Sequence, residues 1–204
     1  ALEYFKPGVN LNIGTGNGQN NAANLSGGAF DGVYNIFIGD STGIANTTGA
    51  ASTAIGSSAL YSNTTGRYHV AIGGNALYSN TTGDFNTAVG TLSMLGNTTG
   101  RENTAVGHLA LPDNTTGIHN VSVGAESSRV NAIGDFNTTV GTFSLYNNTV
   151  SEYTAMGYLA GYQNTTGLEN AAFGYAALYD NVSGNSNTAI GWRALESDTV
   201  SIGN

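Results

Sequence analysis

Cysteine is absent from this chain, proline occurs twice, and only five of the 204 residues are lysine or arginine. Without cysteine, neither a disulfide framework nor a thiolate metal site can form, and the redox compartment stays open. The formal net charge of −8 leaves no basic stripe for a phosphate backbone, so we expect no nucleic-acid partner. No run of 18 apolar residues occurs, which predicts no membrane-spanning helix.

The start of the chain carries no positively charged segment followed by an apolar one, so it does not read as a signal peptide. Because the chain begins with Ala1 rather than methionine, we interpret it as a processed or excised piece of a longer protein. An export signal or membrane anchor is then expected outside this segment.

The dominant feature of the sequence is a short internal repeat. A glycine after an apolar residue recurs at steps of 17 residues, with a single step of 16, and we call it the marker glycine: Gly39, Gly56, Gly73, Gly90, Gly107, Gly124, Gly141, Gly157, Gly174 and Gly191. A fixed short period predicts stacked units that complete one another's core. We therefore expect an all-β parallel β-solenoid, or β-roll, of about ten coils over residues 35–204. Residues 1–34 are off-phase and are interpreted as a degenerate first coil, a cap or a junction to an upstream domain.

A short strand is predicted immediately before each marker glycine. The position three before it is mostly β-branched, which favours an extended backbone. The position directly before the marker is apolar in all ten copies, and we interpret it as the core: Ile38, Ile55, Ile72, Val89, Val106, Val123, Val140, Met156, Phe173 and Ile190. The small residue between them, usually alanine, points the opposite way in a strand. Since that face has no partner within the coil, we expect symmetric association to cover it.

Two further columns follow each marker glycine. Leucine preceded by alanine stands four residues after it, as in Leu60 and Leu77, in either a short strand or one helical turn. Asparagine stands seven residues after it and usually begins Asn-Thr-Thr-Gly, a turn sequence, so stacked coils should align these amides into a ladder. The copy after Gly141 lacks one residue and its corner glycine, which predicts a local distortion. Gly203 is interpreted as a new marker arriving only 12 residues after Gly191, where the array ends or changes module.

No catalytic constellation, cofactor site or metal site is expected. His69, His108 and His119 stand at three different phases of the repeat and are assigned to the surface or to loops. Asp84 and Asp135 lie three coils apart, roughly 14 Å, which is too far for a glycosidase carboxylate pair. Aromatic residues are the candidates for surface recognition, either stacking on sugar rings or packing against the protein itself: Tyr61, Tyr78, Tyr146, Tyr162, Tyr179, Trp192, Phe85 and Phe136.

The strand Thr-Ala-Val/Ile-Gly, the Ala-Leu element and the Asn-Thr-Thr-Gly corner resemble the head repeats of YadA-like trimeric autotransporter adhesins and the Asn-Thr-Ala-Ile-Gly repeats of phage tail fibres and bacterial surface fibres. The resemblance covers about Asn35 to Gly203, although the 17-residue period is longer than in the best-known heads. It implies a homotrimer of parallel β-rolls that is extracellular, on a cell surface or a virion.

Three functions share this fold. The first is a structural and adhesive fibre module that presents a rigid repetitive surface to a host cell, a glycan or another surface, with further copies of itself as partners. The second is ice binding, which the adjacent threonines of Thr64-Thr65 disfavour because they sit at a corner rather than alternating along a strand. The third is a tailspike-type polysaccharide-degrading solenoid, for which the sequence offers no cluster of acids.

Overall fold

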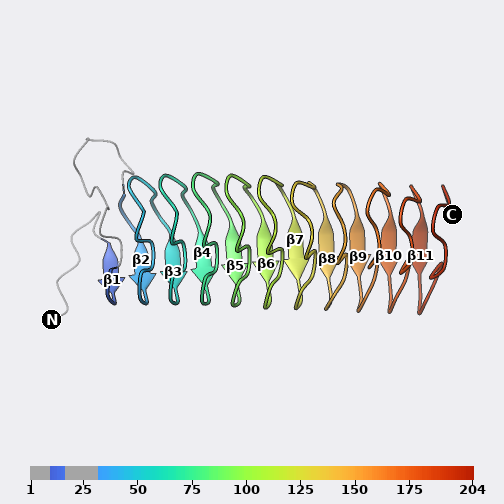
Figure 1. The fold of residues 1–204 in the computed structure, drawn as a ribbon, viewed down its shortest axis with the longest axis horizontal. Coiled ribbons are helices and arrows are strands. Elements are labelled where there is room, and N and C mark those ends of the chain that lie inside the picture. The colour runs from blue at the N-terminus through green and yellow to red at the C-terminus, as the bar shows by residue number, and fades with distance from the viewer. Residues whose placement is uncertain (1–9, 17–31) are drawn as a thin grey trace.

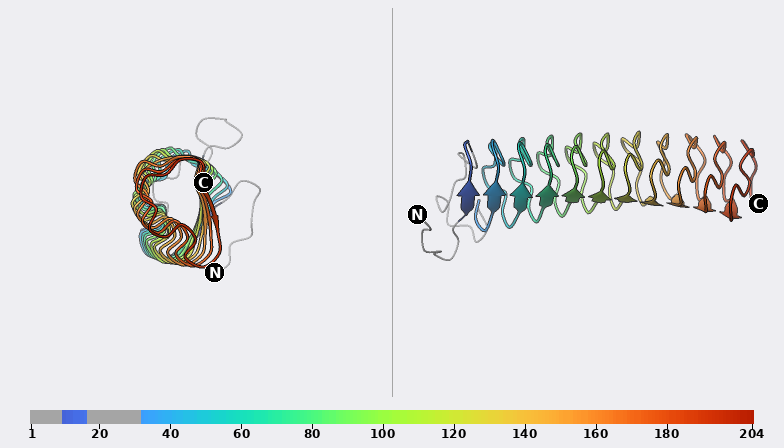
Figure 2. Two further views of the ribbon diagram at one scale, coloured as in Figure 1. Left: turned by 90° about the vertical axis from the view of Figure 1, so that its right-hand side faces the viewer. Right: turned by 90° about the horizontal axis from the view of Figure 1, so that it is seen from below.

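The computed structural model describes residues 10–16 and 32–204, in which a single parallel sheet runs the length of the molecule (Figure 1). Its eleven three-residue strands follow one another in chain order: β1 (Leu11–Ile13), β2 (Ile36–Ile38), β3 (Thr53–Ile55), β4 (Val70–Ile72), β5 (Thr87–Val89), β6 (Thr104–Val106), β7 (Val121–Val123), β8 (Thr138–Val140), β9 (Thr154–Met156), β10 (Ala171–Phe173) and β11 (Thr188–Ile190). Seen along its long axis, the coils superimpose on one closed outline (Figure 2). The predicted all-β parallel solenoid is confirmed.

Strand pairing follows the sequence repeat residue by residue. Thr53 pairs with Val70, and Ile55 with Ile72, which are equivalent positions in successive copies. The off-phase Leu11–Ile13 pairs with Ile36–Ile38 in the same way, so it is a true first strand. The remainder of the predicted cap or junction, residues 1–9 and 17–31, lies outside the described residues.

The interior of the coil is the reverse of the one predicted. Ala54 and its equivalents are fully buried, whereas the residue before the marker glycine is half-buried or exposed, with Ile55 at 36% and Met156 at 41%. The predicted core column of Ile38, Ile55, Ile72, Val89, Val106, Val123, Val140, Met156, Phe173 and Ile190 therefore lies on the outer face of the sheet, and the alanine column forms the core. The prediction was wrong because the interior has room for only one large side chain per coil.

Two exceptions confirm how tightly the interior is packed. Phe37 replaces alanine in the core column, and in that coil the leucine position is Gly43, where an added Cβ would meet the Phe37 ring at 2.7 Å. Tyr153 enters the core from a neighbouring column, and in its coil the leucine position is Gly161, where a Cβ would lie 2.9 Å from the tyrosine hydroxyl. The coils that hold a large core side chain thus leave space for no second one.

The Ala-Leu element is neither a strand nor a helical turn. It is an irregular turn in which Leu60 and Leu77 adopt φ of 52°. At the marker glycine the backbone takes φ of 133° at Gly56, and a Cβ there would lie 2.5 Å from the carbonyl oxygen of Gly73 in the next coil. Only glycine permits this close stacking of one coil on the next.

The predicted ladder of corner asparagines is confirmed. Asn63 donates from Nδ2 to Asn46 Oδ1 at 2.8 Å and to the carbonyl of its corner glycine, Gly66, at 3.0 Å. The same pattern recurs through Asn80, Asn97 and Asn114. These amides are buried, so each bond satisfies a polar group that has left water.

Among the described residues, the ladder is first interrupted at the coil of β7, and beyond it only one further step is made, from Asn164 Nδ2 to Asn148 Oδ1 at 2.8 Å. Asn131 turns its Oδ1 to the backbone N–H of its own Gly134, and within the described part of the chain Asn114 Oδ1 finds no partner. The same coil has a polar interior, where Ser122 contacts Ser127 at 2.6 Å and Ser128 contacts a threonine of the next coil at 2.9 Å. The apolar core is accordingly divided into two clusters, one on each side of this coil.

A second column of buried asparagines, one residue before the strands, was not predicted. Asn86 shows the pattern: its Oδ1 accepts from the backbone N–H of Asn103 at 3.0 Å, and its Nδ2 donates to the Gly100 carbonyl at 2.7 Å. The column comprises Asn35, Asn86, Asn103, Asn120, Asn137, Asn170 and Asn187. Its amides connect the residue before each strand to a carbonyl at the adjacent corner by hydrogen bonds.

His69 occupies an asparagine position in this second column, so its assignment to the surface was wrong. It is 1% exposed, and its Nδ1 accepts from the backbone N–H of Asn86 at 3.3 Å. Its Nε2 faces the carbonyl of Gly83. An asparagine at this position would donate a hydrogen bond to the same carbonyl. Burial lowers the pKa of His69 to about 4, so the ring is neutral and imitates the amide. His108 and His119 are exposed, as predicted.

Both irregular copies stay in phase with the stack. The short copy keeps Thr138 paired with Thr154, and the missing residue is absorbed at the corner, where Asn148 donates to the Val150 carbonyl in place of a glycine. The predicted distortion is therefore confined to one turn. Gly203 is not a marker, because Ile202 pairs with Asn185, 17 residues earlier.

Candidate functional site

The described residues contain no group of three histidines, cysteines or acidic residues placed to hold a metal ion, and no helix long and apolar enough to span a membrane. Asp84 and Asp135 perform a structural task, since each carboxylate accepts from a backbone N–H in the preceding coil, Arg67 at 2.8 Å and Ile118 at 2.7 Å. Two surfaces remain as candidates for function: the outer face of the sheet and the aromatic columns on the turns.

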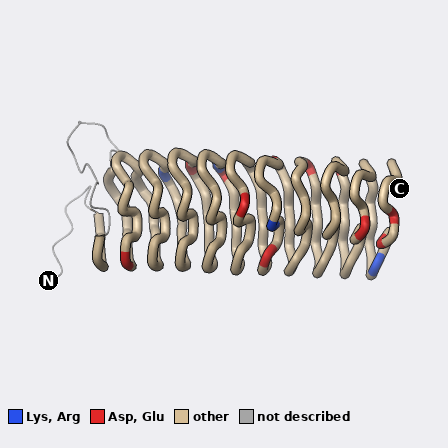
Figure 3. Tube along the Cα trace, in the orientation of Figure 1, with Lys and Arg blue, Asp and Glu red and all other residues tan. Residues whose placement is uncertain are grey.

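The outer face of the sheet is a continuous uncharged surface. From β2 to β11 its two columns hold only isoleucine, valine, threonine, alanine, methionine and phenylalanine. Figure 3 shows how sparse charge is over the whole coil. Ten strand spacings of about 4.8 Å and a width of roughly 10 Å give a face of about 500 Å². One of the two columns is apolar throughout and the other is mostly threonine, and an uncharged face of this size, close to the largest patches that monomers expose, is typical of an interaction surface.

The predicted aromatic residues form ladders. Tyr61 stacks on Tyr78 with ring centroids 4.8 Å apart, and Tyr146, Tyr162 and Tyr179 stack in succession at 5.1 Å. Burial within this second stack raises the pKa of the Tyr162 hydroxyl. Because each inner ring has its faces covered by its neighbours, sugar rings cannot stack along the ladder, and only the faces of the end rings are available.

Two shorter ladders lie on other turns. Phe85 stacks on Tyr68 at 4.8 Å, and Phe136 stacks on His119 at 5.1 Å, both at the corner before the sheet. Trp192 ends a third ladder, following Tyr175 at 6.3 Å. The predicted candidates are therefore distributed over separate columns, and of candidates from different columns only Tyr179 and Trp192 line one groove.

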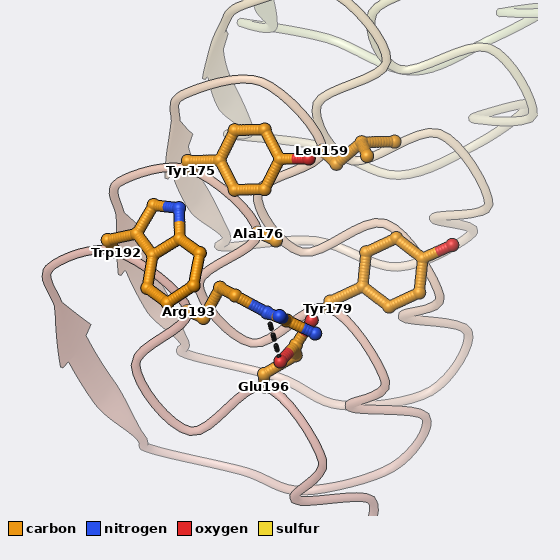
Figure 4. Close-up of a pocket in the computed structure, with 7 residues that line it drawn as sticks. All are labelled: Leu159, Tyr175, Ala176, Tyr179, Trp192, Arg193 and Glu196. Carbon is orange, nitrogen blue, oxygen red and sulfur yellow. Dashed lines mark ion pairs between the residues drawn. The ribbon is translucent and has the colours of Figure 1, made fainter.

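This groove has a volume of about 340 Å³ and is shown in Figure 4. Its lining residues are Leu159, Tyr175, Ala176, Tyr179, Trp192, Arg193 and Glu196. The Arg193 guanidinium lies 5.1 Å from the centroid of the Trp192 ring, and its Nε is 2.5 Å from Glu196 Oε2. Sequence reasoning missed Ala176, whose signal is its small size in a column that holds leucine, phenylalanine or arginine in neighbouring coils.

Comparison of the chain with protein-family models, with curated proteins and with solved structures finds no match. The resemblance of its repeats to fibre repeats therefore stays a prediction.

Proposed function

We propose that this chain is a structural and adhesive fibre module, which assembles as a homotrimer through the uncharged outer face of its sheet and presents its aromatic turns to an attachment target. The observation that carries the proposal is the sheet face, because eleven stacked strands expose one apolar column and one column of threonine and aliphatic residues without a charged side chain. An extracellular position, on a cell surface or a virion, is proposed from the resemblance of the repeats.

The geometry of the face favours association along the fibre. Its columns run parallel to the long axis, so copies related by a rotation about a parallel axis bring equivalent apolar columns together along their whole length (Figure 1). Three copies form a closed group in which every face is covered. Burying about 500 Å² contributes at most ~12 kcal/mol per copy, at ~25 cal/mol per Å² of apolar area, because the threonine hydroxyls of one column are polar. Association costs ~4–15 kcal/mol, so the whole length of the face is needed.

Light scattering after size exclusion tests the assembly. We expect the mass of three chains for the wild type, and the mass of one chain for Ile72→Lys with Val106→Lys, because charges buried in an apolar interface lack partners. Thr99→Lys is the control, since Thr99 is exposed on a corner turn, and should remain a trimer. A wild-type chain that elutes with the mass of one chain at micromolar concentration contradicts the assembly.

Ice binding is the second candidate, and one observation now favours it. Threonines lie on the outward side of the strands, each two residues before a valine, isoleucine or methionine of the same face: Thr53, Thr87, Thr104, Thr138, Thr154 and Thr188. The sequence places this column in the strands, on the same side as the predicted core, and the structure turns that side outward. Thermal hysteresis in a freezing-point assay decides between the two, because a trimer covers this face whereas ice binding needs it open to water.

A further inference from the structure

We propose that the groove over Ala176 is a binding site for a neutral glycan, which it engages through one pyranose ring. This rests on the proposed attachment function, but it concerns a surface other than the sheet face. The turns carrying the groove lie near the described C-terminal end of the stack, between β9 and the last coil (Figures 1 and 4).

The groove lies where a small side chain stands between two longer ones. The position two after the marker glycine varies along the chain, from Ser41 and Ser58 to Leu109 and Leu159, and it is alanine at Ala176. Leu159 and Arg193, in the coils before and after, fill the same column on either side. A gap one side chain deep is thus enclosed along the fibre axis, with Ala176 at its floor.

Aromatic rings form both walls of this gap. Tyr175 and Trp192 stand on one side and Tyr179 on the other, as Figure 4 shows. The ladder of Tyr179 ends here, because the equivalent position in the next coil is Glu196, so one face of its ring is not covered by another ring. An uncovered aromatic face and ring edges suit the C–H face of a sugar, which is apolar and rigid.

Hydrogen-bond donors and acceptors both lie at the rim of the groove. Arg193 supplies N–H donors and Glu196 supplies carboxylate acceptors, held side by side by their ion pair. Adjacent sugar hydroxyls each donate and accept, so they match a paired donor and acceptor. Since the guanidinium is already paired with a carboxylate, an acidic sugar meets no free cation and the site favours a neutral one.

The volume of the groove limits the bound part of the ligand to one sugar ring. Its volume of about 340 Å³ lies at the lower end of the ~300–1,000 Å³ typical of ligand sites. Such a contact is weak by itself. Presentation on several chains of a fibre raises the effective affinity for a polymeric glycan without any new contact.

Trp192 makes the test specific, because it is the only tryptophan in the chain and lies in the groove wall. Tryptophan fluorescence is titrated with cellohexaose, maltohexaose and chitohexaose, and with an α2,8-linked sialic acid hexamer as the acidic probe. We expect a saturable change with at least one neutral hexasaccharide and at least tenfold weaker response to the acidic one.

Ala176→Leu fills the groove with the residue found in the preceding coil and should weaken binding at least tenfold, with the circular dichroism unchanged. Leu92→Ala is the matched control: it opens a similar gap in a coil whose flanking positions, Thr91 and Leu95, are not aromatic, and binding should stay at the wild-type level. Glu196→Gln, which breaks the ion pair without filling the groove, should weaken binding by a smaller factor.

The proposal is overturned if no neutral hexasaccharide gives a saturable signal, if the acidic probe binds best, or if Ala176→Leu binds as the wild type does. The oligomeric mass is measured on the same samples. A chain of one-subunit mass that binds sugar refutes the trimer and keeps the groove, whereas a trimer that binds none refutes the groove alone.

Discussion

Replacing His69 by asparagine should make the solenoid more resistant to acid. The imidazole lies in a column of buried asparagines, and its Nδ1 accepts a hydrogen bond from the backbone N–H of Asn86. Burial keeps the ring neutral. Its pKa falls from 6.5 to about 4, mainly through burial and against the opposing attraction of Asp84. An asparagine offers the same acceptor and donor without a titrating group.

The sign and size follow from proton linkage. Above pH 6.5 both the folded and the unfolded states hold a neutral ring, so His69 adds no pH dependence. As the pH falls toward 4 the unfolded state binds the proton and the folded state does not, which lowers the free energy of unfolding. A difference of about 2.5 pH units corresponds to a loss of ~3.4 kcal/mol below pH 4 and of ~2 kcal/mol at pH 5.

Urea unfolding followed by circular dichroism at pH 7.5 and pH 5 measures this loss. Asparagine is smaller than histidine, which changes the packing at every pH, so the informative quantity is the change in unfolding free energy between the two pH values. His69→Asn should lose ~2 kcal/mol less than the wild type does. His108→Asn, at an exposed histidine, should lose as much as the wild type. Equal losses for wild type and His69→Asn refute a buried neutral imidazole.

Three further predictions concern the stacking of coils. Gly56→Ala should destabilise by ~3 kcal/mol or more because its Cβ would meet a carbonyl oxygen of the next coil at 2.5 Å, whereas Gly74→Ala, with its nearest contact at 4.0 Å, should change the urea midpoint little. Gly43→Leu and Phe37→Ala should each destabilise, but the double variant restores the pattern of the other coils and should recover ~1–3 kcal/mol relative to additivity in a double-mutant cycle. Asn97→Leu removes one step of the corner ladder and leaves a buried amide oxygen of the preceding coil unpaired, which should cost ~1–3 kcal/mol and lower the thermal midpoint.

The sequence by itself determined the repeat, the register and the corners. A 17-residue period with a β-branched residue, glycine and Asn-Thr-Thr-Gly at fixed phases specifies where each strand lies and where each coil bends. Register follows directly, because stacked copies can pair only at equivalent positions if their asparagines are to meet. The corner ladder was predictable for the same reason, and Asn63 donating to Asn46 confirms it.

Only the tertiary structure decided which side of each strand faces inward. A three-residue strand has two faces, and hydrophobicity alone favours the larger apolar column, that of Ile55, as the core. The width of the interior depends on where the turns place the backbone opposite the strand. These turns contain residues in the left-handed conformation, such as Leu60, and the local sequence pattern does not predict the resulting width. With Leu60 already inside, only alanine fits opposite, so isoleucine and valine are left outside. The same closure of the coil buries His69. It also brings Tyr179, Ala176 and Trp192 to one groove, because residues of successive coils that are distant in sequence become neighbours in space.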